Sequence, residues 1–302
     1  MVSRHVVRRA GEAEFVAPGG WAAAARGYRR WSAVDESCGA VHTGFRVNEL
    51  DPGGSVPTHL HSFEESFFVV SGSGIVDTPD GSWRVGPGDY GLLPIGVPHA
   101  WRNDSGEPVR WADMQAPVPR ARFDEDTVLV PALAERDPSP LDVRDLRVRR
   151  FGNITPQHMD MGKQSQDMLA VSASMRTALL VYGGITVKMM VDSDQGARMS
   201  TMFMVKYDRE GAAGQHDHPL EETYFIQEGA TDAYFDGATY RLEVGDVAWA
   251  GVGCVHGFRN ASDPPVRWLE TQAPQPPSRY SYRFARDWDY LQHALSPNGD
   301  DT

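Results

Sequence analysis

The stretch His59-Leu60-His61-Ser62-Phe63-Glu64-Glu65 recurs 157 residues later as His216-Asp217-His218-Pro219-Leu220-Glu221-Glu222. One further histidine follows each copy at the same distance, His99 after the first and His256 after the second. On a β-strand, residues two apart project to the same side, so both histidines of each His-x-His can reach one metal ion. On a helix the same two side chains would diverge by about 200°. The duplicated pattern therefore predicts two metal centres on β-strands.

Each predicted centre has three imidazoles and one carboxylate, from His59, His61, Glu65 and His99 and from His216, His218, Glu222 and His256. Imidazole nitrogen and carboxylate oxygen suit borderline divalent ions, foremost iron, manganese or nickel, with cobalt, copper and zinc also compatible. Four protein ligands leave open coordination positions for a small-molecule substrate, water or dioxygen. The sequence has no dinucleotide-binding or phosphate-binding loop, so no organic cofactor is expected.

The repeat extends far beyond the ligands. Residues 34–117 align with residues 191–274 without a gap, and these ranges are predicted to form an N-terminal and a C-terminal barrel. Residues 118–190 are predicted to be a linker and lead-in segment, of which the methionine-rich residues 153–180 are a candidate lid over the second barrel. The arms, residues 1–33 and 275–302, are dense in aromatic side chains. We therefore expect them to pack on a barrel or on a partner subunit, which favours a homo-oligomer.

The composition restricts the class of protein. The 302 residues carry a net charge of −12, which argues against nucleic acid or an anionic membrane surface as a partner. No apolar run approaches the roughly 20 residues of a membrane span, and the first residues lack the apolar core of a signal peptide. Only Cys38 and Cys254 are present, so no disulfide framework is implied. A cytoplasmic location is expected.

Short strands and turns dominate the predicted secondary structure. Ser66–Val70 and Thr223–Ile226 are rich in β-branched and aromatic residues, and each run precedes a glycine-containing turn. The chain has 30 glycines and 21 prolines, which indicates many turns rather than long helices. An all-β chain with such frequent turns is typical of a sandwich or barrel.

Two longer motifs surround the ligands. The first motif runs glycine, five residues, His-x-His, three residues, Glu, six residues, glycine. Its fixed positions are Gly53, His59, His61, Glu65 and Gly72. The second motif runs glycine, five residues, Pro-x-Gly, two residues, His, three residues, Asn. Its fixed positions are Gly88, Pro94, Gly96, His99 and Asn103. The second repeat departs at two turns, where Gly251 replaces the proline and the opening glycine is displaced by one, to Gly211. With these motifs the sequence resembles the cupin superfamily, and specifically its two-domain members, the bicupins.

The resemblance implies an all-β fold of tandem double-stranded β-helix barrels, the cupin jelly roll, with a metal inside each barrel. Because cupin folds host many chemistries, the fold alone does not decide the function. The leading hypothesis is a metal-dependent dioxygenase similar to bicupin dioxygenases such as flavonol 2,3-dioxygenase. Such an enzyme would cleave a C–C bond of a small enolic or phenolic substrate with O2. Glu222 or Glu65 would switch from metal ligand to general base.

Two alternatives stay open at the level of the sequence. The first is a non-oxidative bicupin metalloenzyme, that is, a decarboxylase, an isomerase or a hydrolase similar to ureidoglycine aminohydrolase. The second is a non-catalytic regulatory protein that binds a metal or a small molecule. Dependence on dioxygen separates the leading hypothesis from the first alternative, and turnover of any substrate separates it from the second.

Side chains alternate along a strand, so residues an even number of positions from a ligand are expected on the same face as that ligand. We call this count strand parity. It places Phe67, Val69, Trp101 and Trp111 in the first barrel and Tyr224, Ile226, Phe258 and Trp268 in the second. On the preceding strands it places Phe45, Val47 and Glu49, or Met202, Met204 and Lys206. The predicted substrate contacts are Trp101, Met202, Met204, Phe258 and Trp268. Tyr224 and Lys206 are predicted to orient an anionic or enolate substrate, which favours the second barrel as the catalytic centre.

Overall fold

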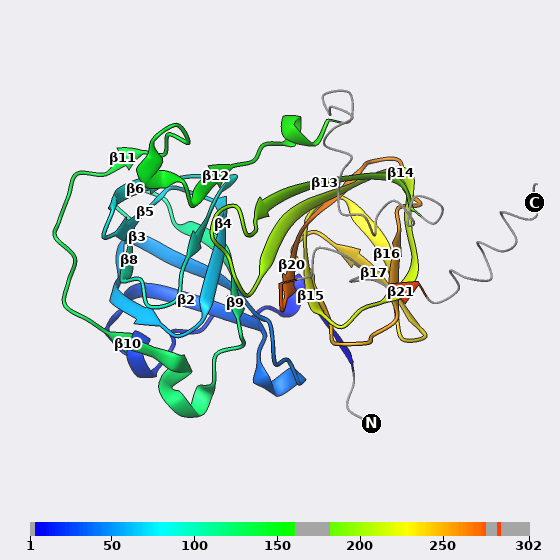
Figure 1. Ribbon diagram of the computed structural model, residues 1–302, viewed down its shortest axis with the longest axis horizontal. Helices are drawn as coiled ribbons and strands as arrows, with labels where there is room; N and C mark the ends of the chain where they lie inside the picture. Colours follow the sequence, from blue (N-terminus) through cyan, green and yellow to red (C-terminus); the bar gives the residue numbers. More distant parts are fainter. Residues whose placement is uncertain (1–3, 161–181, 276–282, 285–302) are drawn as a thin grey trace, which may run out of the picture.

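Two curled β-sheets lie side by side, one for each repeat (Figure 1). The structure is a computed structural model that describes residues 4–160, 182–275 and 283–284. Most of the candidate lid, from residue 161 to its end at residue 180, therefore lies outside the described residues. Within the described ranges there is no α-helix, and no helix is long and apolar enough to cross a membrane. The all-β prediction is confirmed.

The first sheet contains eleven described strands in the order β11-β6-β5-β8-β3-β9-β4-β7-β12, with β2 and β10 also paired to β3. Their bounds are β2 (Arg26–Val34), β3 (Gly44–His61), β4 (Glu64–Ser71), β5 (Gly74–Thr78), β6 (Gly81–Val85), β7 (Asp89–Leu93), β8 (His99–Arg102), β9 (Val109–Ala116), β10 (Thr127–Leu129), β11 (Ser139–Pro140) and β12 (Phe151–Asn153). All pairs are antiparallel except that of β11 with β6.

The second sheet contains ten described strands in the order β1-β18-β15-β20-β14-β19-β16-β17, with β13 and β21 also paired to β14. Their bounds are β1 (His5–Arg8), β13 (Tyr182–Val191), β14 (Thr201–Asp217), β15 (Glu221–Glu228), β16 (Ala230–Phe235), β17 (Ala238–Glu243), β18 (Val247–Ala250), β19 (His256–Arg259), β20 (Val266–Ala273) and β21 (Arg283–Phe284). The strand bounds repeat the offset of the sequence: β15 begins 157 residues after β4, and so does β20 after β9.

The sheets extend beyond the ranges 34–117 and 191–274. β2 lies mostly in the predicted N-terminal arm and β13 lies mostly in the predicted lead-in segment, yet they occupy equivalent places beside β3 and β14. β1 joins the second sheet by pairing with β18, so the N-terminal arm contacts both barrels (Figure 1). The arm thus packs on the barrels of its own chain, one of the two arrangements expected from its aromatic residues.

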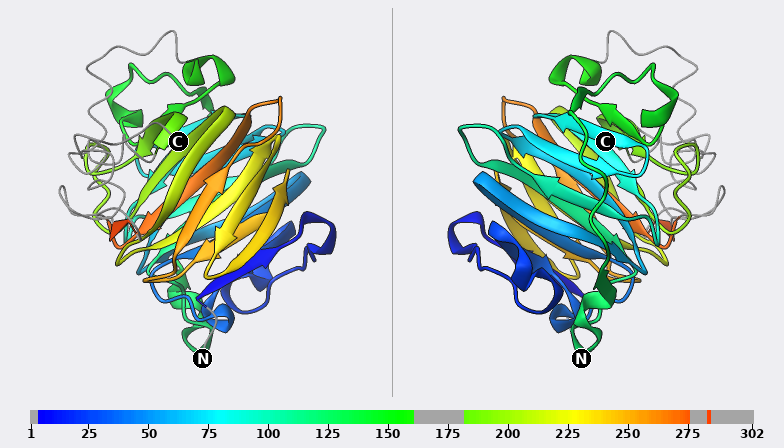
Figure 2. Two further views of the ribbon diagram at one scale, coloured as in Figure 1. Left: turned by 90° about the vertical axis from the view of Figure 1, so that its right-hand side faces the viewer. Right: turned by 90° about the vertical axis from the view of Figure 1, so that its left-hand side faces the viewer.

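The outer faces of the two sheets pack against each other. Seen along the line that joins the domains, the strands of both sheets run in nearly the same direction (Figure 2). One buried apolar cluster includes Phe45 and Val47 of the first sheet together with Met202 and Met204 of the second. The side chains predicted to point into the barrels on these strands therefore point between them.

The parity prediction is wrong on β3 and β14 for a local reason. Each strand has a register shift just before its histidines, between Val56 and His59 and between Ala213 and His216. Such a bulge adds one residue to the strand and reverses the alternation of side chains on either side of it. Counting back from the histidines in steps of two therefore selects the wrong face.

A glycine that sits in a crowded turn gives a prediction for stability. Gly72 follows β4 at φ +74°, and a Cβ added there would lie 2.1 Å from the carbonyl oxygen of Pro108. Gly72→Ala is expected to lower the free energy of unfolding by at least about 2 kcal/mol, because both the left-handed backbone and the contact with a backbone atom are unfavourable. Gly106→Ala is the control, since no atom lies within 4 Å of its Cβ. Equal urea midpoints for the two variants would contradict this account.

Candidate metal centres

The first candidate centre gathers its four side chains from three strands. His59 and His61 lie at the end of β3, Glu65 lies at the start of β4, and His99 opens β8. Nε2 of His61 is 3.3 Å from Oε2 of Glu65, and the rings of His59 and His99 are 4.2 Å apart. All four side chains are buried. The ligand atoms of His61, Glu65 and His99 lie within 4.8 Å of one another, and His59 joins them through its ring contact with His99.

The second candidate centre repeats this arrangement at the corresponding ends of β14, β15 and β19. Oε2 of Glu222 lies 3.0 Å from Nε2 of His218 and 3.1 Å from Nε2 of His256. One ligand atom of His216 lies within 4.8 Å of one ligand atom of each of the other two histidines. This centre is also fully buried.

Backbone carbonyls orient all six imidazoles in the same way. In each ring Nδ1 lies 2.7–3.2 Å from a carbonyl oxygen two residues away in the sequence. A carbonyl can only accept, so Nδ1 carries the hydrogen and the Nε2 lone pair is left for the centre of the cluster. Such a hydrogen bond to the second ring nitrogen is what usually fixes the tautomer of a metal-binding histidine.

At His218 burial is outweighed by the Glu222 carboxylate, which raises the pKa of that imidazole. At three other histidines burial is decisive. It lowers the pKa of His59 to about 4 and holds the pKa of His99 and His216 well below the usual value. Burial alone would raise the pKa of Glu65, but His61 and the other two imidazoles outweigh it and lower that pKa to about 2. Neutral His59 and His99 beside an ionised Glu65 are the protonation states that a metal ion requires at the first centre.

The donor set fits a divalent metal ion. Nε2 of His99 is buried, and no hydrogen-bond partner reaches it from any residue that the structure describes. Buried polar atoms normally have a partner, so an atom without one beside three further ligands marks a place for an ion. His59, His61, Glu65 and His99 would hold one metal, and the equivalent four residues would hold the second.

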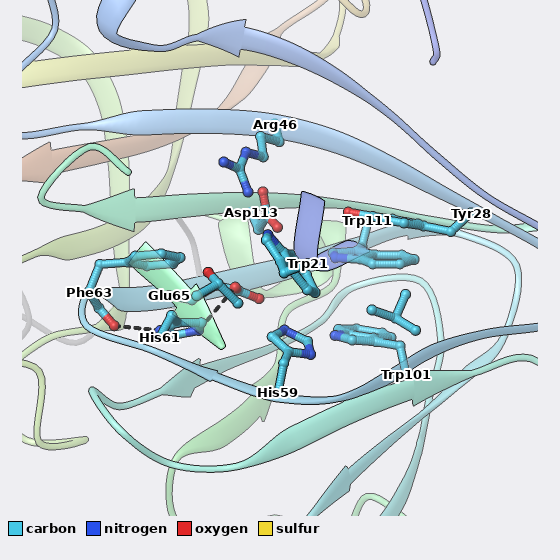
Figure 3. A pocket seen from close by; sticks show the side chains of 12 residues that line it. Trp21, Tyr28, Arg46, His59, His61, Phe63, Glu65, Trp101, Trp111 and Asp113 are labelled. Atoms are coloured by element: carbon cyan, nitrogen blue, oxygen red, sulfur yellow. Dashed lines mark hydrogen bonds and ion pairs between the residues drawn. The ribbon is translucent and has the colours of Figure 1, made fainter. Parts of the chain in front are cut away.

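The first centre opens onto a pocket lined by aromatic rings (Figure 3). The indoles of Trp101 and Trp111 stack with ring centroids 4.2 Å apart. Trp21, from the N-terminal arm, lies against the ring of His59 with a centroid distance of 4.4 Å. The free space that remains is about 20 Å³, close to the volume needed for one water molecule. Trp21 thus nearly closes the pocket.

A buried group of charged side chains completes this pocket, and sequence reasoning missed it. Arg46, 8% exposed, points toward Asp113 (Figure 3) and lies 3.3 Å from the Glu125 carboxylate. Glu125 also pairs with Arg30 and accepts a 3.1 Å hydrogen bond from Nε1 of Trp21. Burial and the nearby Glu65 raise the pKa of Asp113 to about 8. The pocket therefore combines aromatic walls with a buried guanidinium beside the candidate metal ligands.

The sequence contains a signal that Arg46 is unusual, but the strand-parity count assigned this residue to the outer face. The equivalent residue of the second repeat is Phe203, so the repeat itself marks position 46 as different. The parity count placed Arg46 outside the barrel because of the bulge before His59. Glu125 lies in the predicted linker, within a turn where residues 124–126 all have positive φ, and nothing in the sequence places that turn at the pocket.

Comparisons with known proteins agree with the duplicated architecture. The family model described as "Cupin domain" matches residues 46–114 and again residues 203–271. The chain contains two cupin domains. No curated protein matches the sequence.

Solved bicupin structures share this fold. A tryptophan-to-tyrosine variant of oxalate decarboxylase from Bacillus subtilis has a TM-score of 0.61 at 14% identity, covering 98% of this chain and 84% of that one. Oxalate decarboxylase of Lactobacillus farciminis, in a formate complex, has a TM-score of 0.60 at 14% identity, with coverages of 96% and 90%. Salicylate 1,2-dioxygenase from Pseudoaminobacter salicylatoxidans has a TM-score of 0.58 at 15% identity, with coverages of 84% and 70%. At these identities the likeness concerns the fold.

The second cupin domain has a different interior. The hydroxyl of Tyr224 and Nε2 of Gln272 both donate short hydrogen bonds to the Glu222 carboxylate. Behind them, Nε1 of Trp268 donates to Glu270 at 2.8 Å, and burial together with Glu222 raises the pKa of Glu270 well above its usual value. Tyr224, Phe258 and Trp268 lie in this apolar interior, as strand parity predicted. The Glu222 carboxylate is therefore fixed by hydrogen bonds from Tyr224 and Gln272 as well as by its contacts with the histidines.

Three of the predicted pocket residues of the second domain lie elsewhere. Met202 and Met204 are buried between the two domains, in one cluster with Phe45. Lys206 is partly exposed and pairs with Asp208, its Nζ 2.8 Å from Oδ1. Phe203 and the residues two and four further along face the interior instead. Met202, Met204 and Lys206 therefore do not contact the second centre, because the bulge before His216 reverses the alternation of side chains.

One further group of potential ligands lies outside both centres. Ligand atoms of His5, Asp236 and Cys254 lie within 4.8 Å of one another. Both oxygens of Asp236 pair with the guanidinium of Arg4, at 2.9 and 3.0 Å, and burial raises the pKa of the Cys254 thiol to about 12. The carboxylate is thus already neutralised and the thiol protonated, so an ion-pair network that attaches β1 to the second domain accounts for this group.

Proposed function

We propose that the chain is a metal-dependent dioxygenase whose working centre lies in the first cupin domain. Its substrate would be a small enolic or phenolic molecule with an anionic group, cleaved at a C–C bond with O2. The observation that carries this proposal is the pocket of the first domain, in which the His59, His61, Glu65 and His99 cluster faces stacked indoles and the buried Arg46.

Each part of the pocket has a chemical task in this reaction. A bound divalent transition metal would supply Lewis-acid and redox chemistry. Arg46 would pair with the anionic group of the substrate, because a guanidinium presents a fork of donors that matches a carboxylate. Trp101 and Trp111 would form a flat wall for a planar ring or enol. Glu65 would accept the proton of the substrate hydroxyl, and Trp21 would exclude bulk water.

The geometry favours the first domain over the second, contrary to the preference drawn from the sequence. In the second domain the Glu222 carboxylate already accepts hydrogen bonds from Tyr224 and Gln272. The first domain has Phe67 in place of Tyr224, so the Glu65 carboxylate has no hydroxyl beside it at that position. Glu65 is therefore better suited to exchange a proton with a substrate, and the second centre is better suited to a structural ion.

Dependence on dioxygen tests the proposed reaction. Metal-loaded protein, assayed against a panel of small aromatic hydroxy acids and enolic acids, is expected to consume one O2 for each substrate and to stop under anaerobic conditions. Oxygen uptake and product mass measure the stoichiometry. Turnover that continues unchanged without O2 would rule the dioxygenase out.

A non-oxidative decarboxylase is the second candidate, and the small size of the pocket favours it. A pocket with about 20 Å³ of free space beside Arg46 needs less enlargement for a substrate of a few atoms with carboxylate groups than for an aromatic ring. Several solved structures that share the fold are oxalate decarboxylases. Release of CO2 without net consumption of O2 in the same assays would identify this reaction. Tight metal binding with no turnover of any substrate would favour a regulatory protein.

A further inference from the structure

A buried carboxylate of the second domain is bound by a loop of the first. Glu221, 3% exposed, accepts hydrogen bonds from the backbone N–H groups of Val41, His42 and Thr43 at 2.9, 3.0 and 3.0 Å. The hydroxyl of Thr43 donates to the same carboxylate at 3.2 Å. Four donors from one short loop thus surround a single side chain.

The first domain repeats this contact in the opposite direction. Glu64, also 3% exposed, accepts from the backbone N–H groups of Arg198 and Met199 at 2.5 and 3.0 Å and from the hydroxyl of Ser200 at 3.0 Å. Residues 198–200 lie 157 positions after residues 41–43, so the two contacts are equivalent under the repeat. Each domain binds a glutamate of the other with the same loop.

Both glutamates lie next to a candidate metal ligand. Glu64 precedes Glu65 at the start of β4, and Glu221 precedes Glu222 at the start of β15. Successive side chains of a strand point to opposite faces, so one glutamate of each pair enters the metal centre while the other reaches the neighbouring domain. A buried carboxylate is costly unless it is hydrogen-bonded, so this contact holds the strand firmly at the residue before the ligand.

We propose that Glu64 and Glu221 are positioning residues that set the metal ligands Glu65 and Glu222 from the other domain. Each metal centre is therefore completed by a backbone loop of the opposite cupin domain, and neither domain holds its centre correctly alone. The inference rests on metal binding by both centres, which is part of the proposed function, and is independent of the reaction catalysed.

Mn²⁺ binding to the full-length protein tests the proposal. The variants are Glu64→Gln and Glu221→Gln, each also combined with His61→Ala or His218→Ala so that one centre is measured at a time. Outer-shell changes typically weaken metal binding by about 10–100-fold. Glu64→Gln is expected to have this effect on the first centre and less than about a threefold effect on the second, with a changed Mn²⁺ EPR spectrum of the first centre. Glu221→Gln is expected to show the reverse.

Asp246→Asn provides the matched control. Asp246 is a buried carboxylate, 4% exposed, that also accepts backbone N–H groups, from Ala10 and Glu243, but it is not adjacent to a ligand. Its loss is expected to lower the free energy of unfolding and to leave both Mn²⁺ affinities unchanged. Ser200→Ala, which removes only the hydroxyl donor to Glu64, serves if Glu64→Gln does not fold, and should weaken the first centre selectively by roughly tenfold or less.

The outcomes separate the inference from the proposed function. Equal weakening of both centres by Glu64→Gln, or no weakening by either glutamine variant, would overturn the positioning role. Wild-type protein that binds no divalent metal would contradict the proposed function as well.

Discussion

His61→Ala is expected to remove one of two bound metal ions and to lower turnover by more than about 100-fold, because changes in the shell outside the ligands already cost about 10–100-fold. Nε2 of His61 lies 3.3 Å from Glu65, so its loss removes a ligand and frees the carboxylate on which the proposed proton transfer depends. His218→Ala, at the equivalent place in the second domain, is expected to remove the other metal ion and to retain most of the turnover.

The two variants form a matched pair, since the histidines occupy the same position of the repeat and both are buried. Elemental analysis gives the metal content and steady-state assays give kcat, with the unfolding midpoint recorded for each variant. Loss of turnover in His218→Ala together with retention in His61→Ala would move the working centre to the second domain. Loss in both variants at unchanged stability would indicate that both centres take part.

Arg46→Met is expected to raise KM for an anionic substrate by roughly 30-fold or more, because truncating one partner of a buried charge pair costs about 2–5 kcal/mol. Its side chain reaches into the pocket beside Asp113. Glu125 keeps its ion pair with Arg30 in the variant, so the loss should fall mainly on substrate binding rather than on folding. A neutral analogue of the same substrate should lose little, since it does not use the guanidinium.

Arg110→Met is the control for this variant. Arg110 lies on the neighbouring strand β9, is 43% exposed and pairs with Glu49 at the surface. The steady-state parameters of both variants with charged and neutral substrates measure the effect. The anion-binding role of Arg46 would be wrong if Arg46→Met and Arg110→Met changed KM alike, or if the neutral analogue suffered as much as the anion.

Local spacing was sufficient to predict which side chains gather at each candidate centre. His59 and His61 are two apart on one strand, and Glu65 follows across a short turn, so their convergence depends on a few residues of extended backbone. The matching copy 157 residues later showed that the pattern was not accidental, and two cupin domains are indeed present. Homo-oligomerisation and the absence of a nucleic-acid partner stay predictions.

The face of β3 and β14 that each side chain occupies could not be predicted, because it depends on a single extra residue in each strand. The bulges before His59 and His216 reverse the side-chain alternation, so Arg46 enters the pocket whereas Lys206 stays outside. A bulge has little sequence signature of its own, and a count in steps of two cannot detect it.

By itself, the sequence determined the duplicated all-β fold and the eight candidate ligands, because these follow from periodicity within short stretches of chain. Only the tertiary structure showed what lines the pocket of the first centre, because that pocket is assembled from remote segments. Trp21 comes from the N-terminal arm and Glu125 from the segment between the domains, and both meet Arg46 or His59 through contacts between residues far apart in the sequence. The same holds for Glu64 and Glu221, whose partners lie in the opposite domain. Spacing along the chain carries no record of such contacts, since they exist only when distant strands pack together.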